Sequence, residues 1–244
     1  MMSLMDHLVV APVLLPLCTA ALMLLIGDGR RTAKAYVNVA STTLGLAIAV
    51  ALLLRVQSQG AEAFGVYLPG NWPVPYGIVL VADRLSAMMA VLAGAVGLAG
   101  LLYAMARWQQ AGVYFHALFQ LQLMGLYGAF LTADLFNLFV FFEVLLAASY
   151  GLLLHGGGQV RVRAGLHYIA INLMASLLFL IGVAVLYGVT GTLNMADMAQ
   201  KLSLVPDSDR GLLHAGAAIL AIAFLCKAAL WPLNFWLPPA YAAA

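Results

Sequence analysis

Long apolar runs separated by short polar segments make up most of this chain. A helix crosses roughly 30 Å of hydrocarbon with about 20 apolar residues, because it rises about 1.5 Å per residue. The runs are continuous and rich in Leu, Ala, Met and Gly, whereas the strands of a membrane barrel alternate between apolar and polar residues. The pattern predicts an all-α, polytopic transmembrane helix bundle of about seven spans, at residues 8–26, 35–54, 85–105, 114–131, 135–154, 164–187 and 212–237.

Composition removes the alternative of a soluble protein. Only 8% of the 244 residues are charged and 65% are hydrophobic, whereas a soluble domain carries about 25% charged residues. The formal net charge of +2 is too small and too scattered for a nucleic-acid-binding surface, so we expect no nucleic-acid partner. Cys18 and Cys226 lie inside apolar runs, and the sequence contains no nucleotide, haem, flavin or metal-binding motif, so we expect no cofactor and no metal.

Two connections carry structural signals of their own. Residues 69–77 (PGNWPVPYG) are dense in Pro and Gly and lie between two short apolar stretches, which predicts a short hairpin between the second and third spans. Asp83 follows the hairpin and is expected to cap the third helix. Between the sixth and seventh spans, Asn194 is expected to cap a short surface helix that runs to Lys201.

The Lys and Arg residues of the connections predict the orientation, because cytoplasmic loops carry an excess of positive charge. Seven spans place the connections alternately on two sides of the membrane. One side has six such residues and the other has four, so the side with six is predicted to be cytoplasmic. We therefore expect the N-terminus and the hairpin in the periplasm and the C-terminal end of the chain in the cytoplasm. The six are Arg30, Arg31, Lys34, Arg107, Arg161 and Arg163, and the four are Arg55, Arg84, Lys201 and Arg210.

Two charged residues fall inside predicted spans instead of at their ends. Glu143 is the ninth of twenty residues in the fifth run, and Lys227 lies past the middle of the seventh. A charged side chain at this depth costs at least about 2.5 to 3.5 kcal/mol on insertion scales. Apolar replacements usually stabilise a bundle as well as a buried ion pair does. A role in ion or proton handling therefore explains the two charges better than the alternative, a purely structural pair.

The chemistry of the two groups favours protons. Burial favours the neutral form of an amine, whereas a nearby carboxylate favours the charged form. Moving a carboxylate toward or away from a buried lysine therefore switches the lysine between holding and releasing its proton. Glu143 is the partner expected for Lys227, and the two are the candidate catalytic residues.

A proline near the lysine predicts a broken helix. Pro232 has no amide hydrogen, and its ring crowds the carbonyl four residues back, so the seventh helix should kink or open near Lys227. Interrupted helices occur at ion sites in transporters. An ordinary proline kink without function is the alternative.

Polar residues on two other spans recur at helical spacing. Tyr168, Asn172 and Ser176 share one face of the sixth span, and His167 lies beside them. Because an imidazole can relay protons, these four are candidates for a proton path. Interhelical hydrogen bonding is the alternative role, and for His167 it is solvation at the interface. The same two roles are open to a further set on the fourth span, His116, Gln120 and Tyr127.

Four segments resemble the D-type subunit of the Mrp-type monovalent cation/proton antiporters, within a superfamily that includes the antiporter-like subunits of respiratory complex I and membrane hydrogenases. The segments are NWPVPYGIVLVADRLSAMM (71–89), TADLFNLFVFFEVLLAASYGLLL (132–154), YGVTGTLNMADMA (187–199) and FLCKAALWPLNFWLPPAY (224–241). The resemblance implies a proton-translocating subunit, a transporter component rather than an enzyme, in which Glu143 gates the protonation of Lys227. It also implies a bacterial inner membrane, other antiporter subunits as partners, and exchange of Na⁺ or K⁺ for H⁺.

Members of that family are about twice as long and contain two inverted five-helix repeats. The resemblance therefore implies that this chain is a truncated fragment, the N-terminal half only. Residues 1–112 would form helices 1 to 3 with the outer hairpin, and residues 113–244 would form an incomplete first repeat that holds helices 4 to 7 and lacks helix 8.

Two other functions stay open at this point. The first is an antiporter-like subunit of a redox-driven proton pump, a translocase component without a redox cofactor of its own. The forms FVFFEV and TGTLNM favour the Mrp D-type subunit over that alternative. The second is a non-transporting membrane scaffold in which Glu143 and Lys227 form only a structural pair.

Overall fold

The computed structural model describes residues 6–27, 29–58, 60, 64–106 and 112–243. Helices make up most of this part of the chain, and two short strands form its one small sheet. The helices are α1 (Ala11–Leu25), α2 (Arg31–Ser58), α3 (Arg84–Met105), α4 (Phe115–Leu131), α5 (Leu135–Leu153), α6 (Gln159–Thr190), α7 (Met195–Leu202), α8 (Arg210–Lys227) and α9 (Leu237–Ala243), with single 3-10 turns η1 (Asp6–Leu8) and η2 (Pro69–Asn71) and strands β1 (Gly65–Tyr67) and β2 (Leu80–Ala82).

The apolar helices confirm a polytopic membrane protein of about seven spans. Five of them, α2, α3, α5, α6 and α8, are long and apolar enough to cross a membrane, and α1 and α4 are shorter apolar helices. Helical backbone continues past the apolar runs into polar ends, so α2 and α6 are longer than the predicted spans 35–54 and 164–187. Lys34 accordingly lies buried in the first turn of α2 and not in a loop, and Arg107 lies outside the described residues.

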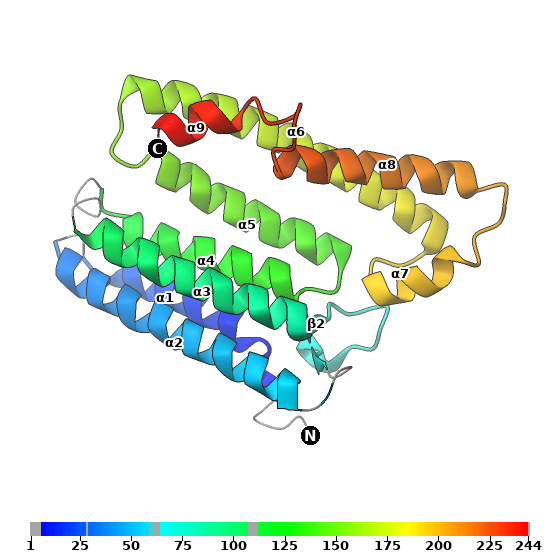
Figure 1. Ribbon diagram of the computed structural model, residues 1–244, viewed down its shortest axis with the longest axis horizontal. Coiled ribbons are helices and arrows are strands. Elements are labelled where there is room, and N and C mark those ends of the chain that lie inside the picture. Colours follow the sequence, from blue (N-terminus) through cyan, green and yellow to red (C-terminus); the bar gives the residue numbers. More distant parts are fainter. Residues whose placement is uncertain (1–5, 28, 59, 61–63, 107–111, 244) are drawn as a thin grey trace.

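Two apolar cores organise the bundle. The first lies among α1, α2, α3 and α4 and includes Leu52, Leu123 and Tyr127. The second lies among α5, α6, α7 and α8 and includes Phe179 and Leu220. Figure 1 shows α5 between the α1–α4 group and a layer formed by α6, α8 and α9. The ionisable residues of the predicted site all belong to this second half of the bundle.

The predicted hairpin and helix caps are confirmed. Strands β1 and β2 pair antiparallel, with Gly65 opposite Ala82. Asp83 caps α3, since its carboxylate accepts a hydrogen bond from the backbone N–H of Ser86 at 2.7 Å. Asn194 caps α7 through two backbone N–H groups, each at 3.1 Å.

Backbone hydrogen bonds fix the point at which α5 begins. The N–H of Ala133 donates to Val79 of the hairpin at 2.9 Å, and the N–H of Leu135 donates to Leu193, before α7, at the same distance. Asp134 lies between these two links and caps α5 by accepting from the N–H of Asn137 at 2.7 Å. Burial raises the pKa of the Asp134 carboxyl, and hydrogen bonds from the backbone N–H groups of Asn137 and Phe136 act in the opposite direction. The hairpin and the segment before α7 therefore hold the start of α5 in place. Because α5 begins at a fixed point, the position of Glu143 in the bundle is fixed as well.

The predicted break near Lys227 is confirmed, although it is a full helix end and not a kink. Lys227 is the last residue of α8, and α9 begins only at Leu237. The N–H of Leu230 donates to Leu225 and the N–H of Ala229 to the carbonyl of Cys226, at 3.0 and 3.1 Å, the pattern of a helix-terminating Schellman motif. Ala229 has φ +50°, a left-handed conformation that costs about 1 kcal/mol without glycine.

Pro232 follows this terminus instead of causing a bend within a continuous helix. The run 212–237 is thus two separate helices with an irregular segment between them. The indole N–H of Trp236 donates to the carbonyl of Cys226 at 3.1 Å and so occupies an oxygen at the end of α8. Irregular backbone at membrane depth needs such partners.

Glycine sets how closely α8 approaches α6. A Cβ on Gly182 of α6 would lie 2.8 Å from the backbone nitrogen of Leu220 and 3.1 Å from the carbonyl oxygen of Gly216, and backbone atoms cannot rotate away. We expect Gly182→Ala to lower the free energy of unfolding by about 1 to 3 kcal/mol, the usual cost of overpacking. The measurement is thermal unfolding of the purified protein in detergent.

Gly188→Ala is the matched control for this substitution. Gly188 lies on the same helix, and a Cβ there would meet nothing within 4 Å. Alanine is the better helix former, so the control should retain or gain stability. Equal loss of stability in both variants would contradict the close approach of α6 and α8 at Gly182.

Candidate functional site

Three polar side chains from three helices meet inside the bundle. The ammonium of Lys227 donates to the Ser176 hydroxyl with Nζ 2.9 Å from Oγ, and the Ser176 hydroxyl donates to Oε1 of Glu143. The ammonium nitrogen and Oε1 are 3.9 Å apart. The structure therefore brings together both predicted ionisable residues and one of the four residues predicted for a proton path. The serine hydroxyl bridges the two charged groups.

The position of each side chain follows from its helix. Glu143 projects from the middle of α5, whose start is fixed at Asp134. Ser176 lies in the middle of the long helix α6 and is buried. Lys227 ends α8, which places its ammonium at the end of a helix that attracts cations. The contact depends on α5, α6 and α8 together, so it cannot be deduced from any one helix.

Aromatic side chains surround the lysine. The Lys227 nitrogen lies 5.5 Å from the centroid of the Phe142 ring, within cation–π range. Phe142, Phe179 and Phe224 contact one another edge to face. The Lys227 side chain is only 11% exposed, against 35% for Glu143. The lysine is thus the more enclosed member of the pair.

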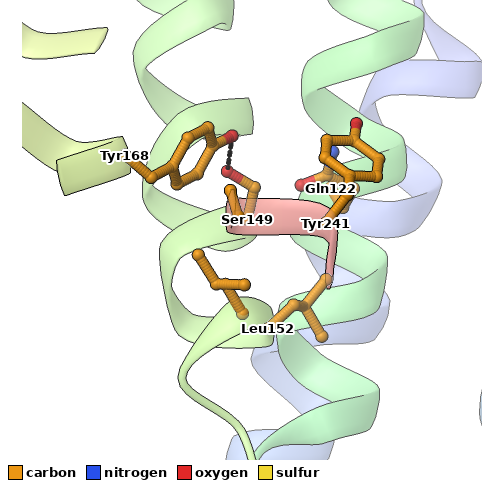
Figure 2. A pocket seen from close by; sticks show the side chains of 7 residues that line it. Gln122, Ser149, Leu152, Tyr168 and Tyr241 are labelled. Carbon is orange, nitrogen blue, oxygen red and sulfur yellow. Dashed lines mark hydrogen bonds between the residues drawn. The ribbon is translucent and has the colours of Figure 1, made fainter. Parts of the chain in front are cut away.

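A cavity of about 610 Å³ opens beside Lys227. Its lining includes Tyr168 and Asn172, so two more of the predicted path residues face the same space as the lysine. The Asn172 amide donates to the carbonyl of Tyr168 at 3.0 Å. The hydroxyls of Tyr168 and Ser149 are hydrogen-bonded at 2.9 Å (Figure 2). Hydroxyl and amide groups therefore continue from the lysine toward the end of α5.

His167 is not joined to this group by any hydrogen bond found among residues 112–243. It is exposed on α6, where its ring lies 6.2 Å from the ring of Phe235. Ser176 lies nine residues further along the helix, about 13 Å at the helical rise. Proton transfer through His167 stays a prediction.

Sequence reasoning missed three residues near the site. Ser149, Gln122 and Trp236 line the cavity beside Lys227 together with the predicted residues. Ser149 and Gln122 are neutral, and neutral polar residues in apolar helices commonly serve helix packing. Only the fold shows that they face the same space. The spacing of Ser149 from Glu143 is six residues, which gives no shared helical face and so no signal.

The polar residues of the fourth span belong to a separate network. Gln120 donates to the Asn38 side chain at 2.6 Å and to Thr42 at 3.0 Å, and His116 Nδ1 lies 2.9 Å from the Asn38 amide. These bonds join α4 to α2, away from the three helices that carry Glu143, Ser176 and Lys227. Tyr127 packs in the first apolar core. Hydrogen bonding between helices accounts for Gln120 and His116 without a transport role.

Metal ligands do not gather in the part of the chain that the structure describes. No three His, Cys, Asp or Glu side chains there come close enough to hold a metal ion. The candidate site instead consists of an amine, a hydroxyl and a carboxylate joined by consecutive hydrogen bonds. An amine and a carboxylate joined in this way can pass a proton from one to the other through the hydroxyl.

In a proton-translocating subunit of the kind that the sequence resemblance implies, Ser176→Ala is expected to slow proton flux by about tenfold while the protein still assembles, because Lys227 and Glu143 lose the hydroxyl that bridges their 3.9 Å gap. Ser176→Thr retains the hydroxyl and should keep most of the rate. The measurement is proton flux in membrane vesicles. Equal rates for Ser176→Ala and the unmodified protein would contradict a bridging role.

Comparison with known proteins finds a family model that matches the part of the chain carrying this site. Residues 132–244 match the family described as "NADH:quinone oxidoreductase/Mrp antiporter, TM", a range that contains Glu143, Ser176 and Lys227. Those residues are similar to this membrane-domain family. The rest of the chain is covered by longer relatives.

Two curated relatives extend the match to nearly the whole chain. The D-type subunit of a probable K⁺/H⁺ antiporter of Rhizobium meliloti is 57% identical over 98% of this chain and 45% of its own length. The D-type subunit of the Na⁺/H⁺ antiporter of Alkalihalophilus pseudofirmus is 40% identical over 97% of this chain and 47% of its own length. The resemblance to this antiporter subunit is confirmed. The chain spans about half the length of the curated relatives that it matches, and these relatives are transporter components.

Solved structures agree with the fold. A chain in the Mrp complex of Dietzia sp. DQ12-45-1b superposes with a TM-score of 0.89 at 34% identity, covering 99% of this chain and 44% of that chain. A chain of an archaeal respiratory membrane complex, the membrane-bound sulfane sulfur reductase, gives a TM-score of 0.85 at 29% identity, covering 98% of this chain and 48% of that one. The helix bundle is therefore shared by Mrp and respiratory membrane subunits.

Proposed function

We propose that this chain is the proton-translocating part of a subunit of a multi-subunit monovalent cation/proton antiporter. The observation that carries the proposal is the chain of contacts from Lys227 through Ser176 to Glu143. An amine and a carboxylate that share one hydroxyl can exchange a proton without a large movement. Relatives named as subunits of K⁺/H⁺ and Na⁺/H⁺ antiporters support the transport class.

The proton step follows from the direction of the hydrogen bonds. Lys227 gives a proton to the Ser176 oxygen as Ser176 gives its own hydroxyl proton to Glu143. The amine and the carboxyl are then both neutral, and the serine is unchanged. Neutral groups lose the attraction that holds them together, which frees the amine to take a new proton from the cavity beside it. Glu143 thereby controls whether Lys227 is protonated.

The proposal extends to partners and location. Other subunits of the antiporter, the lipid bilayer, H⁺, and Na⁺ or K⁺ would be its partners, and no cofactor is required for the proton step. The membrane would be the bacterial inner membrane, with the start of α1 at the periplasmic face and α9 near the cytoplasmic face, as the Lys and Arg count predicts. Residues 1–112 would be the N-terminal helices, and residues 113–244 the incomplete first repeat.

Vesicles that contain the complete antiporter test this function. Addition of Na⁺ or K⁺ to everted vesicles that have been acidified inside should drive protons out, which a pH-sensitive dye reports. Vesicles without the subunit are the control. A proton gradient that no monovalent cation dissipates would contradict the proposal.

Two observations favour the respiratory alternative, the family description that includes NADH:quinone oxidoreductase and the structural likeness to the sulfur reductase complex. It predicts proton movement that is driven by a respiratory electron donor and stops without one. The higher identity to the named antiporter subunits supports cation/proton exchange. Purification of the assembled complex distinguishes the two, since a redox pump would bring redox subunits with it.

A further inference from the structure

One aromatic side chain, Trp236, joins the end of α8 to α6. Trp236 lies in the segment that follows the break and is only 5% exposed. Its indole N–H donates to the carbonyl of Cys226, the residue before Lys227, with the nitrogen 3.1 Å from the oxygen. Its ring packs on the ring of Tyr168, with the two centroids 5.2 Å apart. A single buried side chain therefore contacts both the helix that ends at Lys227 and the helix that carries Ser176.

The attachment of this segment to α6 involves a second pair of rings. Phe235 lies against His167, with the ring centroids 6.2 Å apart, so two consecutive aromatic residues pack on two consecutive residues of α6. Tyr168 is held in turn by α5, because its hydroxyl and that of Ser149 are hydrogen-bonded at 2.9 Å (Figure 2). The surface on which Trp236 rests is thus itself fixed within the bundle.

The last turn of α8 needs support from outside the helix, because the final carbonyl groups of a helix have no partner within it. The carbonyl oxygen of Cys226 can accept two hydrogen bonds. One comes from the N–H of Ala229 at 3.1 Å, within the turn that ends the helix, and the other comes from Trp236. The bond from the indole ties the end of α8 to α6. Movement of this last turn would carry the Lys227 ammonium away from the Ser176 hydroxyl, which it meets at 2.9 Å.

We propose that Trp236 is a positioning residue that holds the Lys227 ammonium against Ser176 and Glu143. Through the Cys226 carbonyl it fixes the last turn of α8, and through the Tyr168 ring it fixes that turn relative to α6. Its indole N–H takes no part in the proton step. This inference rests on the proposed role of Lys227 and adds the side chain that determines where the amine lies.

Trp236→Phe in the complete antiporter removes the indole N–H and retains an aromatic ring against Tyr168. Proton flux per assembled complex should fall about two- to tenfold, the change in an equilibrium that loss of one hydrogen bond of usual strength produces. Trp231→Phe is the matched control, because it is the same substitution in the same segment at a side chain that is 81% exposed. Its flux should match that of the unmodified protein. Equal flux in the two variants would overturn the proposal.

The pH profile of the flux separates positioning from a role in folding. An amine that lies farther from a carboxylate gives up its proton at a lower pH. Half-maximal flux in Trp236→Phe should therefore move down by about 0.3 to 1 pH unit, which corresponds to a two- to tenfold change in a protonation equilibrium. Loss of folded protein would lower the flux equally at every pH, so an unchanged profile would overturn the proposal. The titratable groups that face Lys227 are Glu143 of α5, Tyr168 of α6, Tyr241 of α9 and the neighbouring Cys226 of α8, and all four are retained in the variant.

An analogue of tryptophan separates the hydrogen bond from the size of the ring. 3-Benzothienylalanine, inserted at position 236 through a stop codon, has the bicyclic shape of tryptophan but carries sulfur in place of the N–H group. It should lower the flux and shift the pH profile as Trp236→Phe does. Normal flux with an unchanged profile would overturn the proposal. Failure of the analogue to assemble would also overturn it, since the hydrogen bond would then serve folding.

Failure of this inference is distinguishable from failure of the proposed function. If Lys227 does not carry protons, Lys227→Ala retains flux, whatever the variants at position 236 do. If only the positioning role is wrong, Lys227→Ala loses flux although the variants at position 236 retain it.

Discussion

Lys227→Ala is expected to reduce cation-driven proton flux to the level of vesicles that lack the antiporter. The substitution removes the amine that contacts Ser176 at 2.9 Å, so no titratable group is left at the end of α8. Lys227→Arg is the sharper test. A guanidinium retains the positive charge and donates hydrogen bonds to Ser176 and Glu143, but it does not release its proton near neutrality. Both variants should therefore lose flux, as measured with a pH-sensitive dye in everted vesicles.

The arginine variant separates two roles for the pair. If Lys227 and Glu143 only hold α8 against α5, arginine should serve nearly as well as lysine and flux should persist. Lys201→Ala is the control for loss of a lysine in general, because Lys201 pairs with Asp197 at 2.9 Å on the surface helix α7 and takes no part in the site. Its flux should match that of the unmodified protein. Coupled transport in Lys227→Ala would contradict the proposed proton step.

The fold was largely predictable because a membrane restricts what a sequence can form. Each apolar run must be a helix, since unpaired backbone groups are too costly in hydrocarbon. The caps at Asp83 and Asn194 and the hairpin rest on local hydrogen bonding, which the sequence also encodes. Helix ends were less predictable, because helical backbone extends into polar flanks that hydropathy does not detect, as in α2 and α6.

The residue at which α8 ends could not be predicted from local sequence rules. Pro232 correctly indicated a break, but the helix ends five residues earlier, at Lys227. Its end depends on a left-handed Ala229 and on the Trp236 indole hydrogen bond to Cys226. Alanine carries no signal for a left-handed conformation, and the Trp236 contact joins residues ten positions apart across an irregular turn. Neither feature is visible in a hydropathy pattern.

Some residues of the candidate site could be predicted from the sequence and others could not. Charge inside an apolar run identified Glu143 and Lys227, because a bilayer excludes such residues unless they are needed. Helical spacing included Ser176 among several candidates but could not select it, since its role comes from lying between two other helices. Gln122 and Ser149 were not singled out because neutral polar residues are ordinary in a span. The cavity that they line distinguishes them only in three dimensions.

Glu143→Gln is expected to lower proton flux by at least about tenfold. The substitution removes the negative charge opposite Lys227, and a shift of one pKa unit in a group already changes its protonation equilibrium tenfold. The amide retains an oxygen that can accept from the Ser176 hydroxyl, so the helices should remain packed and the subunit should still assemble. What the amide cannot do is take up the proton that Ser176 passes on. The measurement is proton flux in everted vesicles, normalised to the amount of assembled antiporter.

Glu143→Asp is the matched control, because it retains a carboxylate on a side chain one methylene shorter. It should recover part of the flux lost in Glu143→Gln, since the group can still titrate although it lies farther from Ser176. If Glu143→Gln assembles and transports protons as fast as the unmodified protein, the carboxylate does not control Lys227. The pair would then be structural, and the protein would be a membrane scaffold. A purely structural role also predicts that Glu143→Asp, with the longer gap, is the less stable of the two variants, which thermal unfolding in detergent would reveal.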